Sequence, residues 1–302
     1  MGLGEESASL NEKRPTAAAC AQESEYGEGY DYAIGSPHIR HAALRELLDS
    51  RIEDAIHEVL ARQQSCAVLE VGAGHGTFTE TVLRAGGTPT LTEMSTASFD
   101  LLKRKFSDIP EVRVIYESDG SAAINGETQF DVILLISVIH HIPDYIGVVS
   151  ALCDKALRPG GIVLTFQDPL WYPRQSRLAT ILSSGSYFVW RVGQGELRRG
   201  LRTRWRRLRR IYDESEPSDM VEYHAVRQGV DESALLDLFR ARFTDVELDT
   251  YFSTSMPVLQ AVGARYFPHN TFGILARGLN RTDQLDDSAE THRRDSAETH
   301  SS

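Results

Sequence analysis

The sequence predicts an α/β fold, in which a mostly parallel β-sheet is covered by helices on both faces. Strand-like and helix-like segments alternate along residues 66–166, a pattern typical of parallel strands joined by crossover helices. The segment Phe130–Ile136 reads as an apolar strand, as expected where both faces of a sheet are buried. A glycine-rich turn joins the first strand to the first helix of the series, and such turns open ligand sites in open α/β sheets.

The first strand is expected over residues 67–71, and it is apolar except for Glu70. Three glycines at alternating positions follow it, which are Gly72, Gly74 and Gly76. Glycine lets the backbone turn sharply and approach a ligand without a Cβ in the way. A helix expected from Thr77 presents free N–H groups in its first turn, which suit the anionic end of a ligand.

The spacing of the glycines narrows the class of ligand that the turn is expected to bind. A dinucleotide fingerprint is G-x-G-x-x-G, whereas these glycines fall as G-x-G-x-G with Thr77 at the third dinucleotide position. Together with Glu70, this pattern resembles the first motif of the class I S-adenosylmethionine-dependent methyltransferases. A plain strand-to-helix turn is the alternative, so the assignment depends on the segments downstream.

Those segments extend the resemblance. The second strand, residues 88–92, ends at Glu93, where an acid can accept both hydroxyl protons of a ribose; a surface acid is the alternative. The resemblance implies that Asp119, after a third strand over 112–116, binds the adenine amino group. The motif Leu157–Gly161, a tight turn before a strand over 162–166, also resembles the family. The implied cofactor is S-adenosylmethionine, and the implied contacts are Glu70, Gly72, Gly74, Gly76, Glu93, Met94, Asp119, Gly120 and Ser137.

The family's fold implies a seven-stranded Rossmann-like sheet whose last strands, expected over 246–252 and 272–276, form an antiparallel pair. We expect a disordered leader (1–25), an N-terminal helical cap (26–65), a methyltransferase domain (66–278) and a disordered tail (279–302) that contains a duplicated segment. Ser36 and Pro37 mark the start of the cap helix. Its apolar stripe is Leu44, Leu48, Ile52, Ile56 and Val59.

An insertion over about 170–229 interrupts the alternation and is expected to form a helical lid. It is rich in aromatic residues, and eight arginines lie between residues 198 and 210 on a helical pattern. A solvated face with aliphatic stems over apolar surface explains such a run. An anionic substrate or carrier, a membrane and RNA are the alternatives.

Composition excludes several classes of protein. The 302 residues carry 43 acidic and 32 basic side chains, for a net charge of −11, which disfavours a nucleic-acid binder. The three cysteines are far apart in the sequence, so neither a disulfide framework nor a thiolate metal site is expected. No apolar run is long enough to cross a membrane. We expect a cytoplasmic protein that binds no metal, and a homodimer is compatible with the sequence.

Candidate catalytic groups follow the strand ends, where ligands of open α/β sheets bind. The predicted catalytic residues are His141, His224 and Asp168, because a base assists transfer to a hydroxyl. His141 lies in a His-His-Ile-Pro-Asp segment that is frequent in the family, and the alternative is that this segment only shapes the pocket. The predicted substrate contacts are Tyr30, His140, Trp171, Tyr223 and Arg227.

The resemblance and the aromatic insertion together favour a small, partly hydrophobic methyl acceptor. Transfer to oxygen in specialised metabolism is the favoured interpretation, and transfer to carbon or nitrogen is the alternative. Two other classes stay open, which are a methyltransferase of RNA or of a carrier-bound substrate, and a non-catalytic regulator that binds the cofactor. A nicotinamide enzyme is disfavoured by Thr77.

Overall fold

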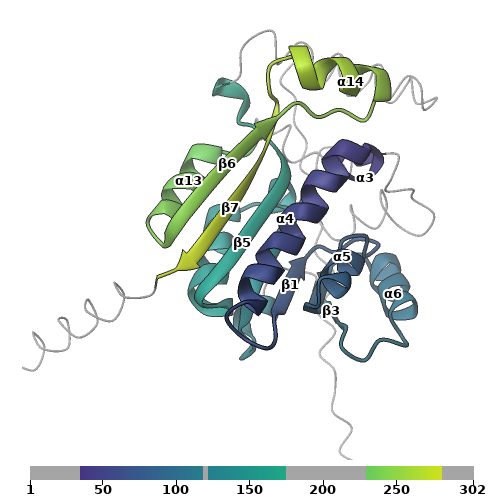
Figure 1. Ribbon diagram of the computed structural model, residues 1–302, viewed down its shortest axis with the longest axis vertical. Coiled ribbons are helices and arrows are strands. Elements are labelled where there is room, and N and C mark those ends of the chain that lie inside the picture. Colours follow the sequence, from purple (N-terminus) through teal and green to yellow (C-terminus); the bar gives the residue numbers. More distant parts are fainter. Residues whose placement is uncertain (1–34, 118–121, 175–228, 281–302) are drawn as a thin grey trace, which may run out of the picture.

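The computed structural model describes residues 35–117, 122–174 and 229–280 (Figure 1). Within these ranges seven strands form one sheet in the order β3-β2-β1-β4-β5-β7-β6. The strands are β1 (Ala67–Val71), β2 (Thr88–Glu93), β3 (Arg113–Tyr116), β4 (Phe130–Ile136), β5 (Leu157–Pro169), β6 (Phe243–Tyr251) and β7 (Thr271–Leu279). The predicted fold class, a Rossmann-like sheet with an antiparallel pair at the end of the chain, is confirmed.

The strand pairings place the carboxyl-terminal ends of β1, β2, β4 and β5 at the same edge of the sheet. These four strands and β3 are parallel, with Val71 of β1 opposite Thr92 of β2 and Leu135 of β4. Strand β7 pairs antiparallel with both β5 and β6. The strand order reverses between β1 and β4, and ligands of open α/β sheets bind at such a point.

One face of the sheet is covered by the N-terminal helices. In Figure 1 the long helix α4 (Ala42–Leu60) runs across the sheet, close to the short helix α3 (Pro37–Arg40) and to α5 (Thr79–Arg84). The stripe predicted from periodicity is buried in α4, since Leu48, Ile52 and Ile56 have no exposed surface. This stripe packs on apolar side chains of β1, β4 and β5.

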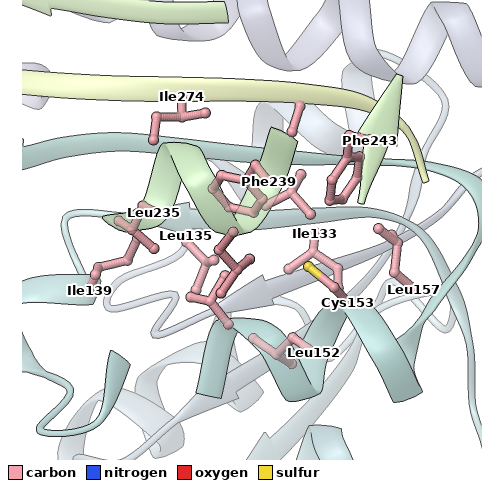
Figure 2. Packing of buried hydrophobic residues seen from close by; sticks show 14 of the residues in the cluster. Ile133, Leu135, Ile139, Leu152, Cys153, Leu157, Leu235, Phe239, Phe243 and Ile274 are labelled. Carbon is pink, nitrogen blue, oxygen red and sulfur yellow. The ribbon is translucent and has the colours of Figure 1, made fainter. Parts of the chain in front are cut away.

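The opposite face carries helix α8 (Tyr145–Ala151), its π-helical continuation η2 (Leu152–Ala156) and α13 (Glu232–Arg240). Figure 2 shows Phe239 of α13 and Cys153 of η2 meeting Ile133 and Leu135 of β4. Because residues alternate across a strand, Val132, Leu134 and Ile136 pack on the α4 side instead. Strand β4, which is apolar except for Asp131, therefore supplies both cores. Helix α6 (Thr96–Lys105) covers Leu91 of β2.

The cap helix is divided, which is a difference from the single helix expected after Pro37. Helix α3 ends at Arg40, and His41 is extended, with φ −96° and ψ 116°. The His41 ring lies 2.7 Å (Nε2 to O) from the carbonyl of Thr254, which belongs to the segment after β6. This long-range contact holds the break between the two helices against the segment after β6.

Three further local expectations were wrong. Helix α5 begins at Thr79 and not at Thr77, because the glycine turn continues to Phe78.

The segment Leu157–Gly161 is a bulged part of β5 and not a tight turn before it. Here Arg158 binds the buried carboxylate of Asp131, which also accepts the N–H of Ala67 at 2.8 Å. Helix α14 (Pro257–Tyr266) between the last two strands was not expected.

Several expectations fall outside the described residues. They are the leader and most of the tail, the lid with its arginine run, and the site residues Tyr30, Asp119, Gly120, Tyr223, His224 and Arg227. The two flanks of the insertion are described, and they lie side by side: Leu170 forms a parallel bridge with Val230. Across the ranges that the structure describes, no helix is long and apolar enough to cross a membrane.

Candidate active site

The glycine turn after β1 needs glycine for two separate reasons. Gly72, Gly74 and Gly76 all have left-handed backbones, with φ of 66°, 56° and 69°, a region that side chains disfavour. A Cβ on Gly76 would lie 2.6 Å from Cε2 of Phe106, and one on Gly72 would lie 2.8 Å from Cγ2 of Val138. The turn is therefore packed closely against α6 on one side and the end of β4 on the other.

Glu93, at the end of β2, holds this turn in place. Its Oε2 accepts the N–H of Gly74 at 2.8 Å, and its Oε1 accepts those of Met94 and Ser95, each at 2.9 Å. Only 7% of Glu93 is exposed, so the alternative of a surface acid is wrong. One buried carboxylate thus joins the glycine turn to the segment that begins α6.

Glu70 lies beneath the turn and fastens the helix that follows it. Its Oε2 accepts the hydroxyl of Thr79, the first residue of α5, at 2.6 Å. Burial raises the pKa of Glu70 to about 7, although the bond from Thr79 and the positive charge of Lys105 oppose this rise. Lys105 also donates to the carbonyl oxygens of His75 and Gly76, at 3.1 and 3.2 Å.

The neighbouring ends of β4 and β5 are both strained. Ser137, directly after β4, and Gln167, in β5, are left-handed without being glycine, with φ of 55° and 68°. Such residues cost free energy and cluster at functional sites. The pairing of β5 with β7 shifts register between Thr165 and Asp168, so Gln167 lies in a bulge that re-aims the side chains beside it.

The bulge brings Asp168 to His140. Oδ1 of Asp168 lies 2.8 Å from Nδ1 of His140 and accepts the His140 N–H at 3.1 Å. Asp168 is fully buried, and this burial raises the pKa of its carboxyl while the bonds from His140 oppose the rise. The predicted catalytic residue His141 is adjacent, with its ring 4.0 Å from that of His140 (centroid to centroid). The contact with the carboxylate belongs to His140.

Two polar residues of this region were not foreseen. His38 of α3 is 3% exposed and stacks on Phe78, at the end of the glycine turn, with 5.7 Å between ring centroids. Burial, aided by the charge of His140, lowers the pKa of His38 to about 3. Tyr251, the last residue of β6, accepts the N–H of Gln167 at 2.9 Å, and burial raises the pKa of its hydroxyl well above 10. No local motif marks either residue.

Trp171 lies at the start of the insertion. Its backbone N–H donates to Glu232 at 3.2 Å, and the guanidinium of Arg174 lies over its ring, 4.6 Å from the centroid. These contacts place Trp171 in the paired flanks of the insertion. Its predicted substrate role remains a prediction. Within the described ranges, no group of three or more His, Cys, Asp or Glu side chains is arranged to hold a metal ion.

Comparisons with known proteins agree with this arrangement. Residues 69–163 match the family model described as a methyltransferase domain. The ubiquinone biosynthesis O-methyltransferase of Paracidovorax citrulli is 30% identical over 106 residues, which is 34% of this chain and 44% of that protein. That of Salmonella newport is 32% identical over 97 residues, or 32% of this chain and 40% of that protein. The chain therefore matches less than half the length of these relatives.

Solved structures share the fold. A proposed sarcosine dimethylglycine methyltransferase from Galdieria sulphuraria superposes with a TM-score of 0.54 at 14% identity, over 88% of this chain and all of that one. The N-methyltransferase NodS of Bradyrhizobium japonicum, solved with S-adenosylhomocysteine, gives a TM-score of 0.50 at 13% identity, over 87% and 99%. These similarities support the architecture and leave the acceptor open.

The buried Glu70 predicts a pH dependence of stability that Glu70→Gln removes. The pKa of about 7 in the folded state lies above the ordinary glutamate value of about 4.5. The folded state therefore binds the proton more tightly, and the stability that this group contributes falls as pH rises from about 4.5 through 7. The free energy of unfolding of the wild type should fall by about 2 kcal/mol relative to Glu70→Gln between pH 5 and 8. Urea denaturation at several pH values measures this difference.

The exposed Glu127→Gln variant serves as the control, and it should follow the pH dependence of the wild type. If Glu70→Gln also followed the wild type across this pH range, the carboxyl would not titrate as inferred.

Proposed function

We propose that this protein, a class I S-adenosylmethionine-dependent methyltransferase by its fold and by residues 69–163, methylates a hydroxyl group of a small, partly hydrophobic metabolite in specialised metabolism. The observation that carries the proposal is the contact of His140 with Asp168, at the edge of the sheet where the glycine turn also lies. A hydroxyl acceptor needs a base, and an oriented histidine can be that base.

The residues around the glycine turn fit the cofactor. The left-handed glycines offer backbone without a Cβ, and Glu93 offers a buried carboxylate beside them. Glu93 would hold the ribose hydroxyls, and Met94 and Ser137 border the same region. S-adenosylmethionine, when bound, supplies a methyl group that is activated by its sulfonium. The protein then has to orient the acceptor, exclude water and take one proton.

His140 can take that proton because Asp168 orients its ring. A carboxylate beside Nδ1 favours the proton on Nδ1, which leaves the lone pair on Nε2. Nε2 would then accept the proton that the acceptor hydroxyl loses when its oxygen is methylated, and the electron pair of the broken carbon–sulfur bond would leave with S-adenosylhomocysteine. Asp168 would stabilise the imidazolium that results, as the aspartate does in a Ser-His-Asp triad. We therefore favour His140 as the base, with Asp168 as its positioning partner, and retain His141 and His224 as alternatives.

Transfer to oxygen is favoured over transfer to nitrogen for two reasons. A free amine carries its own lone pair and needs no base, whereas the site contains an oriented histidine. The similar proteins from Paracidovorax citrulli and Salmonella newport are named O-methyltransferases, although they match only about a third of this chain. Transfer to carbon also needs a base and remains the alternative.

The function can be tested with S-adenosylmethionine that carries a radiolabelled methyl group, incubated with the protein and an extract of host cells. We expect label in the low-mass fraction that organic solvent extracts. Label in acid-precipitable material would instead indicate RNA or a carrier-bound substrate, with salt-sensitive binding. Bound S-adenosylhomocysteine without transfer to any fraction would favour the regulator.

The assignment of Glu93 to the ribose can be tested by pairing a mutation with a change in the ligand. Glu93→Ala should weaken S-adenosylhomocysteine binding by about 1.5–3 kcal/mol, typical for hydrogen bonds to a charged group. Because Glu93 also holds three backbone N–H groups, the variant should unfold at a lower temperature.

Calorimetry with the 2′-deoxy analogue of S-adenosylhomocysteine separates these two effects. The wild type should bind the deoxy analogue at least tenfold more weakly than the parent ligand, and Glu93→Ala should bind the two almost equally. An equal loss in both proteins would assign Glu93 to the support of the turn alone.

The roles of the two adjacent histidines can be separated by matched variants. His140→Gln and Asp168→Asn should each lower the turnover number about 10²–10⁴-fold, the usual range for loss of general-base catalysis. Their affinity for S-adenosylhomocysteine should stay within about twofold of the wild type. His141→Gln is the control and should retain most of the activity. A larger loss in His141→Gln than in His140→Gln would reverse the assignment.

A further inference from the structure

Three buried side chains, from α3 and from the end of β5, each have one polar atom without a hydrogen-bond partner within the described part of the chain. These atoms are Nδ1 of His38, Oε1 of Gln167 and Oδ2 of Asp168. Buried polar atoms in folded proteins are almost always paired with protein groups or with ordered water. Each of these orphaned atoms therefore indicates a position where a polar ligand group or water belongs.

The segment 252–255 after β6 connects the N-terminal cap, which carries His38, with the end of β5, which carries Gln167. The His41 ring and Arg40 of the N-terminal cap bind the carbonyl oxygens of Thr254 and Ser255, at 2.7 and 3.0 Å. From the other side, Nε2 of Gln167 donates to Oγ of Ser253 at 2.7 Å. His38 is thus held near the strained end of β5, although more than 120 residues separate them in sequence.

The chemistry of His38 restricts what it can bind. Its low pKa, about 3, keeps the imidazole neutral at physiological pH, so one ring nitrogen donates a hydrogen bond and the other accepts one. A neutral ring offers no compensation for a carboxylate or a phosphate. It suits a hydroxyl, which can donate and accept, and the orphaned oxygens of Gln167 and Asp168 also require a donor.

We propose that His38 binds the methyl acceptor directly, through a second hydroxyl group that neighbours the one to be methylated. This inference rests on the proposed function, and it adds two statements to it. The acceptor carries at least two hydroxyl groups near each other, and helix α3 is a wall of the acceptor site. His38 is a substrate-contacting residue in this role, whereas His140 takes the proton.

A packing role is the competing explanation. His38 is buried against the ring of Phe78, and a histidine can fill such a space without contacting any ligand. The two roles make opposite demands on a replacement. A ligand contact needs a polar atom at the position of Nδ1, whereas packing next to a phenylalanine is served better by an apolar side chain.

The pair His38→Asn and His38→Leu separates these roles, because asparagine and leucine have nearly the same shape and differ in polarity. Both variants lose the imidazole ring, so their stacking losses are matched. The probe is the low-mass acceptor fraction that the wild type labels. The readouts are the apparent KM for that fraction, the turnover number, the Kd for S-adenosylhomocysteine and the melting temperature.

We expect His38→Leu to raise the apparent KM at least tenfold and His38→Asn to raise it less than about threefold. The Kd for S-adenosylhomocysteine should change less than twofold in both. The exposed His57→Leu is the control and should match the wild type in every readout.

A KM in His38→Leu that is equal to or lower than that of His38→Asn, with a higher melting temperature, would overturn the inference in favour of packing. Parallel weakening of S-adenosylhomocysteine in both variants would also overturn it, by assigning His38 to the cofactor. Absence of any labelled fraction with the wild type contradicts the proposed function itself, and the inference falls with it.

Discussion

Three backbone N–H groups converge on the buried carboxylate of Glu93, and these bonds join the two halves of the candidate cofactor site. One N–H comes from the glycine turn after β1 and the others from the start of the segment that leads to α6. A turn built from left-handed glycines has little conformational preference of its own. Its shape has to be fixed by partners, and Glu93 does this from inside while Lys105 does it from outside through two carbonyl oxygens.

The part of the candidate site around His140 and Asp168 depends on the change of strand direction between β5 and β7. Strand β5 is parallel to β4 but antiparallel to β7, and its bulge lies where it extends past the end of β4. Gly273 of β7 faces this bulge, since a Cβ there would lie 2.7 Å from the carbonyl oxygen of Thr165. The close approach of β7 thereby supports the left-handed Gln167 and the position of Asp168 after it. The strained backbone of Gln167 therefore helps to place the buried carboxylate of Asp168 beside His140.

The sequence predicted what local patterns encode. The glycine turn, Glu93 at a strand end and the stripe of α4 follow from spacing and periodicity, and the alternation of strands and helices was sufficient for the sheet. His38 and Tyr251 could not be predicted, because each enters the site through contacts with residues far away in sequence, His38 with Phe78 and Tyr251 with Gln167. The sequence also could not predict which of His140 and His141 contacts the carboxylate of Asp168. Both lie in one short 3₁₀ turn, and only the bulge in β5 decides which ring meets the carboxylate.

The segment 252–255 links these distant parts, and side-chain amides make it rigid. Gln260 accepts the N–H of Thr254 and donates to the carbonyl of Phe252, while Asn270 makes the same pair of bonds to Ser253. Each amide replaces the backbone partners that an irregular segment lacks. Because this segment holds both Gln167 and the N-terminal cap, its rigidity reaches His38 and the end of β5 at once. The region of the candidate site around His38 and Gln167 is thus positioned by residues outside it. One of them is Gln260 of helix α14, which lies outside residues 69–163, the part of the chain that matches the methyltransferase domain model.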